Sequence, residues 1–232
     1  MPEGFKKVTH CLFDMDGLLL NTEALYTKIT QQILDELGTG HIYTGDFKVQ
    51  LMGGQSYEVA SRIIEHYKLS VSVEDYVVRQ RQLALESMPK TELLPGAERL
   101  LRHLHAKKVP IALATSSSNE MYNLKTKKHT ELFKLFDHKV CGSSDAEVVH
   151  GKPAPDIFIV AARRFPDQPD PSQCLVFEDA PNGVRAALAA GCQVILVPED
   201  YVTEEMRKEP TLVLDSLADF KPELFGLPAF DD

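Results

Sequence analysis

Residues 11–23 read CLFDMDGLLLNTE, and this stretch decides the fold because it joins a buried strand to paired acids. An apolar run ends at Asp14, Asp16 follows two positions later, and Gly17 comes directly after it. Short, continuously apolar runs are typical of strands buried on both faces of a parallel sheet. Ligands of such sheets bind at the carboxyl ends of the strands, so paired acids at this place indicate a functional site.

The composition is typical of a globular protein with a sizeable core. The chain has 232 residues, 44% of them hydrophobic and 25% charged, with a formal net charge of −9 at pH 7. This negative charge argues against nucleic acid polymers and membranes as partners. We find no apolar run long enough for a signal peptide or a membrane span and expect a cytoplasmic protein. The cysteines show no CxxC spacing, which predicts buried, reduced thiols.

Apolar runs and amphipathic stretches alternate along most of the chain. Strands are predicted over 9–14, 110–115, 138–142, 174–179, 193–197 and 211–214, and helices over 95–109, 153–165 and 182–191. We expect the last helix to be capped by Asn182 and to end at Gly191. Strands that alternate with helices predict a Rossmann-like α/β fold, with a mainly parallel sheet flanked by helices.

The segment between the first strand and residue 95 departs from this alternation. It contains three stretches of helical periodicity, 22–38, 56–69 and 74–88, and no convincing strand. Because the segment is too long for a loop, we expect an inserted helical domain. The predicted division is an α/β core of residues 1–20 and 91–232 and a helical cap of residues 21–90.

Reactive side chains follow several of the predicted strands. Thr115 ends the second strand, Lys152 precedes a helix, and Glu178 and Asp179 end the fourth strand. Carboxylates gathered near one point repel one another, so a hard cation such as Mg²⁺ is the expected cofactor. The candidate metal ligands are Asp14, Asp16, Glu178 and Asp179.

This set of side chains suits phosphoryl transfer. Asp14 can act as nucleophile and form an aspartyl-phosphate. Asp16 can protonate the leaving oxygen and later activate a water molecule. Lys152 and the Thr115 hydroxyl can hold the phosphoryl oxygens. Gly17 permits a turn that lets backbone N–H groups join them.

In chain order, these segments resemble the four motifs of the haloacid dehalogenase superfamily of phosphatases. DMDGLLLN resembles the first motif, DxDGxLxD, and IALAT ends on the Thr of the second. GKPAPDIF resembles the third and FEDAPNG the fourth. The resemblance implies a Mg²⁺-dependent phosphomonoester hydrolase with a type 1 cap, in which the strands carrying Asp14, Thr115 and Asp179 are neighbours. Asn21 stands where the first motif more often has Asp, and it can still cap the helix that follows.

Further segments are similar to one branch of that superfamily, the pseudouridine-5'-phosphatases. They are GLLLNTE, ALATSS, HGKPAPDIF, CLVFEDAPNGV and FKPELFGLP. The similarity implies pseudouridine 5'-phosphate as the substrate. The family places specificity residues after the glycine that corresponds to Gly53. The candidate substrate-binding residues are Glu23, Gly53, Gly54, Gln55, Ser56, Ser116 and Asn119.

Each motif alone has a plainer interpretation. A lone DxD also occurs in glycosyltransferase metal sites and solvated loops, Thr115–Ser118 suits a helix cap, and Gly53-Gly54 suits a turn. A dehalogenase is disfavoured, because a metal-free displacement does not need Asp16 or the Glu178-Asp179 pair.

A hexose-phosphate mutase and a non-catalytic binding module stay open as alternatives, as do sugar and polyol phosphates such as 2-deoxyglucose 6-phosphate and glycerol phosphate. A closing cap predicts a small phosphorylated metabolite, and we expect a monomer.

Overall fold

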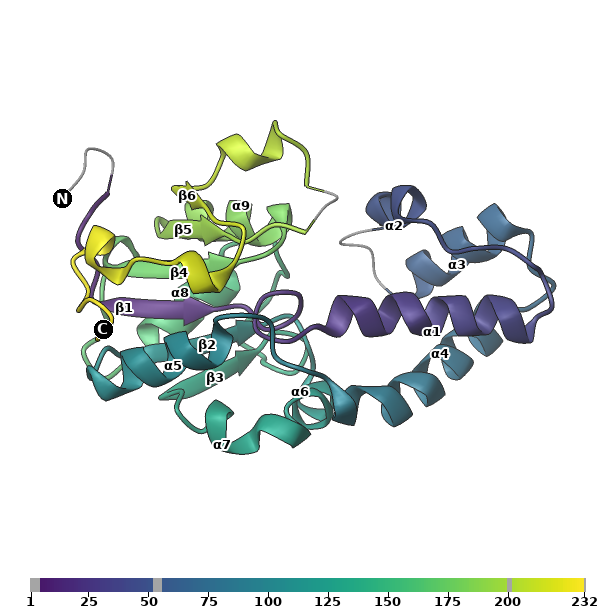
Figure 1. The fold of residues 1–232 in the computed structure, drawn as a ribbon, viewed down its shortest axis with the longest axis horizontal. Coiled ribbons are helices and arrows are strands. Elements are labelled where there is room, and N and C mark those ends of the chain that lie inside the picture. The colour runs from purple at the N-terminus through teal and green to yellow at the C-terminus, as the bar shows by residue number, and fades with distance from the viewer. Residues whose placement is uncertain (1–4, 52–55, 200–201, 232) are drawn as a thin grey trace. The chain divides into compact units, whose positions relative to one another are not determined.

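The structure is a computed structural model in which residues 5–51, 56–199 and 202–231 are described (Figure 1). The chain divides into two compact units. One comprises Met1–Asn21 and Glu92–Asp232, and the other comprises Thr22–Thr91. The boundaries expected from the sequence, after residues 20 and 90, each lie one residue away.

The larger unit is built on a six-stranded sheet with the order β3-β2-β1-β4-β5-β6, in which all neighbours are parallel. The strands are β1 (His10–Phe13), β2 (Ile111–Thr115), β3 (His138–Cys141), β4 (Cys174–Glu178), β5 (Gln193–Leu196) and β6 (Leu212–Val213). β1, β2, β4 and β5 are buried along their whole length. The six predicted strands and the Rossmann-like fold are therefore confirmed.

The strand order changes direction at β1. From β1 the chain continues to β2 and β3 on one side, and it then returns to place β4, β5 and β6 on the other side. Phe13 at the end of β1 is in register with Leu113 of β2 and with Phe177 of β4. At such a point of a parallel sheet, ligands bind beyond the carboxyl ends of the strands. The predicted adjacency of the strands that carry Asp14, Thr115 and Asp179 is confirmed.

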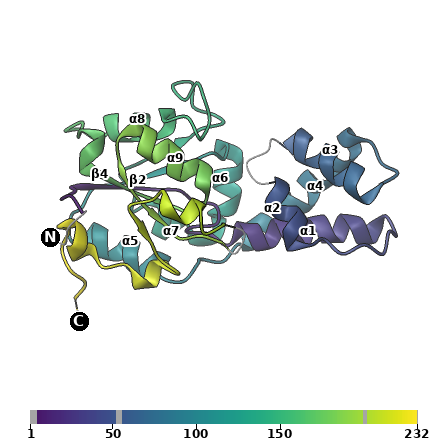
Figure 2. The ribbon, with the colours of Figure 1, turned by 90° about the horizontal axis from the view of Figure 1, so that it is seen from above.

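Helices cover both faces of the sheet (Figure 2). They are α5 (Ala97–Ala106), α6 (Asn119–Lys125), α7 (Thr130–Phe133), α8 (Asp156–Arg163) and α9 (Pro181–Ala190). α5 and α7 pack on the face that includes Phe13, and α8 and α9 pack on the opposite face, which includes Leu12. Alternate residues of β1 thus enter different cores, as the pleat of a strand requires.

The start of α9 corrects one expectation. The N-cap is Ala180 and Pro181 is the first helical residue, so Asn182 lies inside the helix and does not cap it. Proline at the first helical position has no hydrogen bond to lose and a backbone angle suited to the helix, which lets α9 begin earlier. The helix ends, as predicted, at Gly191, which has a φ of 90°. α6 and α7 were not predicted from the sequence.

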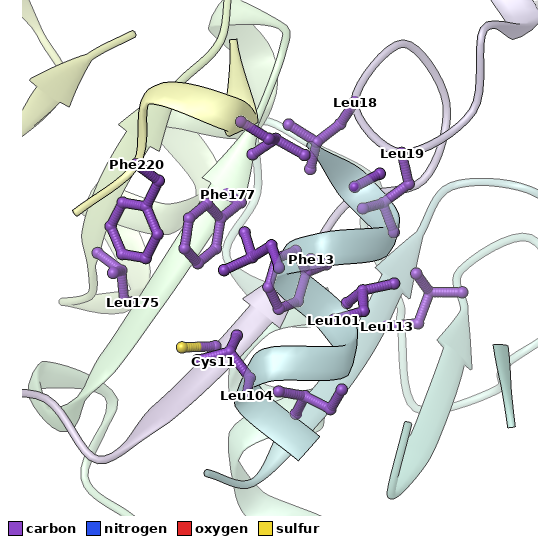
Figure 3. Close-up of a cluster of buried hydrophobic side chains, with 14 of the residues drawn as sticks. Cys11, Phe13, Leu18, Leu19, Leu101, Leu104, Leu113, Leu175, Phe177 and Phe220 are labelled. Carbon is purple, nitrogen blue, oxygen red and sulfur yellow. The ribbon is translucent and has the colours of Figure 1, made fainter. Parts of the chain in front are cut away.

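Aromatic side chains pack β1 firmly against β4 (Figure 3). The rings of Phe13 and Phe177 are stacked, with centroids 4.5 Å apart and an interplanar angle of 3°. Phe220 packs edge-on against Phe177 at 5.0 Å. The next residue after each stacked phenylalanine is acidic, so this contact holds two functional backbone positions side by side.

The smaller unit is helical. It contains α1 (Thr22–Glu36), α2 (Gly45–Leu51), α3 (Ser56–Tyr67) and α4 (Val73–Ser87), and α1 and α3 both pack on α4. The Arg79 guanidinium of α4 donates to both carboxylate oxygens of Glu36 on α1, at 2.7 and 2.6 Å. The Ser72 hydroxyl caps α4 by accepting from the Asp75 amide. α2 was not predicted, whereas the other three helices were.

Short 3₁₀ turns complete the described chain, at Met88–Lys90, Lys127–His129, Pro171–Gln173, Met206–Lys208, Leu217–Asp219 and Pro222–Phe225. Among the described residues, no helix combines the length and the apolar character that crossing a bilayer would require. Cys11, Cys141, Cys174 and Cys192 are all free and buried, as predicted. Burial raises the pKa of the Cys174 thiol to about 12, which keeps that thiol protonated at neutral pH.

Truncation of a buried leucine tests the packing around β1 and β2. Leu113 is fully buried in the core of Figure 3, whereas Leu188 on α9 is 40% exposed. We expect Leu113→Ala to lower the free energy of unfolding by about 2–5 kcal/mol, because it leaves a cavity that the sheet cannot close. Leu188→Ala should change it by no more than about 0.5 kcal/mol. Urea denaturation measures both, and equal losses would contradict the packing described here.

Candidate active site

Three buried carboxylates meet at the carboxyl ends of β1 and β4. Asp14 follows β1, and its amide still donates to the Phe177 carbonyl of β4 at 3.0 Å. Asp14, Glu178 and Asp179 are 6%, 1% and 5% exposed, and each offers an oxygen within 4.8 Å of the others. A cluster of this kind, held by the ends of two adjacent strands, fits a hard divalent cation.

Lys152 joins two of these carboxylates. Its Nζ donates to Asp14 Oδ1 and to Glu178 Oε1, both at 2.6 Å, and to the Ala114 carbonyl at 3.2 Å. Burial alone would lower the pKa of Lys152, but the charges of Asp14 and Glu178 raise it above its usual value. Lys152 is therefore a cation at neutral pH, in the position that the sequence predicted, shortly before α8.

The acids of the cluster influence one another's ionisation. Burial raises the pKa of Asp14 to about 7, and Lys152 opposes this effect while Glu178 and Asp16 add to it. Carboxylate oxygens within 4.8 Å of one another repel when ionised, so a divalent cation among them would favour their ionised forms. The donor set thus fits Mg²⁺, with Asp14, Glu178 and Asp179 as the side chains that would hold it.

The Glu178 side chain is held in place by its surroundings. Its Oε2 accepts from the amides of Asp179 and Ala180 at 3.1 and 3.4 Å, at the start of α9. Gly183 lies directly beneath it, and a Cβ at that position would come within 1.9 Å of the carboxylate carbon. The close approach explains the glycine in this turn of the helix, because any side chain would displace Glu178.

Asp16 lies on the loop beyond β1, as expected. The groups that hold its carboxylate differ from the lysine that contacts Asp14. Its Oδ1 accepts from Lys125 Nζ at 2.7 Å. Its Oδ2 accepts from the Ser117 hydroxyl at 2.9 Å and from the Thr115 hydroxyl at 3.4 Å. Gly17 makes the turn that follows, with a φ of 79°. That Asp16 also binds the metal stays a prediction.

Thr115 lies at the end of β2 with no exposed surface, and its hydroxyl accepts from the Ser117 amide at 3.1 Å. The following segment caps α6, because the Ser118 hydroxyl accepts from the Met121 amide. The interpretation of residues 115–118 as a helix cap is therefore correct. The expectation that Thr115 lies beside an acid of the first motif is correct as well. Ser117 and Lys125 were missed by the sequence analysis, since nothing in KTKKH distinguishes the first lysine from the others.

The predicted substrate-binding residues fall into two groups. Ser116 and Asn119 follow β2, where the Ser116 carbonyl accepts from the Ser143 hydroxyl and the Asn119 backbone amide donates to the Ser144 hydroxyl. Asn119 also lines a cavity of about 280 Å³ together with Lys139, Cys141 and Ser144.

The other predicted residues belong to the smaller unit. Glu23, at the start of α1, forms an ion pair with Lys48 of α2 at 3.1 Å. Gly53, Gly54 and Gln55 lie outside the described residues, and Ser56 begins α3. The substrate-binding roles of both groups stay predictions.

Comparison with known proteins places these residues in a family. A family model described as a haloacid dehalogenase-like hydrolase matches residues 8–191, which include all four motifs. The chain belongs to this family. The resemblance inferred from the motifs is therefore confirmed, as is the assignment of a hydrolase.

Two relatives match almost the whole chain. A Drosophila melanogaster protein named "Probable pseudouridine-5'-phosphatase" is 59% identical over 227 residues, covering 98% of this chain and 97% of that protein. The Arabidopsis thaliana "(DL)-glycerol-3-phosphatase 1, mitochondrial" is 45% identical over 232 residues, covering 99% of this chain and 77% of that protein. Both names describe phosphomonoesterases, in agreement with the predicted enzyme class.

A solved structure of a putative β-phosphoglucomutase from Thermotoga maritima has the same fold. The TM-score is 0.75 at 25% identity, and the alignment covers 94% of this chain and 97% of that one. The named activities of these three proteins all concern phosphorylated compounds, but the compounds differ. The shared fold therefore does not identify the substrate.

Gly183 gives a test of the carboxylate cluster. We expect Gly183→Ala to displace the Glu178 carboxylate and to raise the Mg²⁺ concentration for half-maximal activity by about tenfold or more, the effect typical of a group that orients metal ligands. Gly45→Ala is the matched control, because a Cβ there meets nothing within 4 Å. Mg²⁺ titrations of phosphate release measure both variants. An unchanged Mg²⁺ requirement in Gly183→Ala, with the fold intact by circular dichroism, would show that Glu178 does not help to hold the metal.

Proposed function

We propose that this protein is a Mg²⁺-dependent phosphomonoester hydrolase that acts through an aspartyl-phosphate on Asp14. The observation that carries the proposal is the cluster at the ends of β1 and β4. There, a carboxylate at a strand end contacts a buried lysine and has oxygens of two further acids within 4.8 Å, and a second aspartate lies two residues along the chain. Bound Mg²⁺ would supply positive charge to the oxygens of the transferring phosphoryl group.

In the first step, an Asp14 oxygen attacks phosphorus and the bond to the ester oxygen breaks. Asp16 gives its proton to that departing oxygen, which leaves as an alcohol. Lys152 lies 2.6 Å from Asp14 Oδ1, so it is close enough to donate to a phosphoryl oxygen as charge develops. The buried Thr115 hydroxyl at the end of β2 is the second candidate donor.

In the second step, water attacks the phosphorus of the aspartyl-phosphate. The Asp16 carboxylate takes a proton from this water, the bond between phosphorus and Asp14 breaks, and inorganic phosphate leaves. Asp16 is again protonated and Asp14 is again a free carboxylate, so the enzyme returns to its starting state. One side chain thus serves as acid and then as base.

The proposed substrate is pseudouridine 5'-phosphate. The proposal is supported by 59% identity to a protein with that named activity. A second candidate is glycerol 3-phosphate, supported by the 45% identical relative named for it. We also propose that the enzyme is monomeric and cytoplasmic, although one relative is named as mitochondrial.

Replacement of the nucleophile tests the reaction. Asp14→Asn should lower kcat by about 10⁴-fold or more, because it removes the group that forms the covalent intermediate. Rapid acid quenching with labelled p-nitrophenyl phosphate should trap phosphate on the wild-type protein and none on the variant. Asp215→Asn, an exposed aspartate elsewhere in the larger unit, controls for the loss of one charge. Activity of Asp14→Asn within tenfold of the wild type would contradict the proposal.

A comparison of kcat/KM values tests the substrate. Pseudouridine carries an N1–H donor where uridine has the glycosidic bond, so a buried acceptor facing N1–H would favour pseudouridine 5'-phosphate by up to about 10⁴-fold. The panel is pseudouridine 5'-phosphate, uridine 5'-phosphate, glycerol 3-phosphate and 2-deoxyglucose 6-phosphate. A uridine value equal to the pseudouridine value would exclude recognition of that donor, and a higher glycerol phosphate value would favour the second candidate.

A mutase is distinguished by its product. With a hexose phosphate and a catalytic amount of the hexose bisphosphate, a mutase forms the isomeric sugar phosphate without net release of phosphate. We expect release of phosphate and no isomer.

A further inference from the structure

A second buried lysine lies beside the acids, and the reaction described above does not use it. Lys125 is the last residue of α6 and is 3% exposed. Its Nζ donates to Asp16 Oδ1 at 2.7 Å and to the Ser117 hydroxyl at 2.9 Å. A lysine is rarely buried to this extent unless it is paired, and here its partner is the proposed acid and base.

The contacts of Asp16 fix the orientation of its carboxylate. Oδ1 is held by Lys125, and Oδ2 is held by Ser117 and, more weakly, by Thr115. Donors on both oxygens prevent rotation about the last side-chain bond. Ser117 also accepts from Lys125, so each of Asp16, Ser117 and Lys125 is hydrogen-bonded to the other two. This network lies at the end of β2 and the end of α6.

The two buried lysines serve different acids. Lys152 contacts Asp14 and Glu178, and Lys125 contacts Asp16. Lys152 therefore lies at the proposed nucleophile and the carboxylate cluster, whereas Lys125 lies at the proposed acid and base. The Asp16 side chain is 24% exposed, so water can replace a lost partner. The removal of Lys125 therefore does not leave Asp16 as a buried carboxylate without a partner.

We propose that Lys125 is a positioning residue that holds the Asp16 carboxylate in the orientation needed for both proton transfers. This inference rests on the proposed function, because it requires Asp16 to act as acid and base. Proton transfer needs the two heavy atoms within hydrogen-bond reach, about 2.6–3.2 Å. A misplacement of about 1 Å can cost about 10²-fold in rate.

The test combines Lys125→Met with Asp16→Asn. Methionine retains much of the length and the apolar part of the side chain but cannot hold the carboxylate. With a nucleoside monophosphate, whose leaving oxygen needs a proton, we expect Lys125→Met to lower kcat by about 10- to 100-fold with KM within about threefold of the wild type, because both proton transfers slow together. In the Asp16→Asn background the same substitution should have almost no further effect, since residues that act as a unit are not additive.

Lys127→Met is the matched control. Lys127 is exposed and lies two residues from Lys125, so this variant removes the same charge from the same segment. It should retain wild-type activity. A second measurement follows the phosphoenzyme after rapid mixing with p-nitrophenyl phosphate. Lys125→Met should accumulate it, because water activation slows while a good leaving group hardly needs a proton.

Three results would overturn the inference. They are wild-type kcat in Lys125→Met, an equal loss from this substitution with and without Asp16→Asn, and an absence of accumulated phosphoenzyme. Equal losses would indicate a purely structural role. If Lys125→Met does not fold, Lys125→Gln, which retains an N–H donor, is compared in the same two backgrounds, with a smaller loss expected. Failure of the proposed function is recognised separately, by a wild-type protein that releases no phosphate.

Discussion

The bridge from Lys152 to Asp14 and Glu178 is the interaction on which the rest of the site depends. An ammonium group and two carboxylates are buried together with contacts of 2.6 Å, and a third carboxylate lies beside them. Such a group of charges is stable only when its geometry is held, because the removal of one partner leaves an uncompensated buried charge. The parts of the fold around it can each be understood as a way of keeping these atoms in place.

The sheet supplies the first part of that support. β1 and β4 are adjacent because the chain reverses direction after β3, and the stacked rings of Phe13 and Phe177 pack the two strands together one residue before the acids. The second part comes from α9, whose first amides bind Glu178 and whose Gly183 leaves room for it. The position of Asp14, the proposed nucleophile, therefore depends on the packing of β1 against β4 more than on the loop that follows.

The sequence predicted those features that a local pattern determines. The six strands were found because each is a short apolar run, and the four motifs were found because each follows such a run or begins a helix. Lys125 was not found, because its role depends on the path of α6 after β2 and no periodicity reveals it. α2 and α7 have seven and four residues, too few for a helical period to appear, and Pro181 decided the start of α9 against Asn182.

Lys152 and Lys125 also help to explain how two aspartates so close in sequence could take the different roles proposed for them. Asp14 and Asp16 are two residues apart, but Gly17 turns the chain after them and their carboxylates enter separate networks. The first network is buried and includes the carboxylate cluster, as suits the proposed nucleophile, whose charge must be balanced. The second is formed by hydroxyl groups and Lys125 around a carboxylate that water still reaches, as suits a group that must exchange protons. The contacts of both networks join the chain's own residues around the strand ends. They fit the transfer of a phosphoryl group and do not by themselves identify the alcohol that carries it.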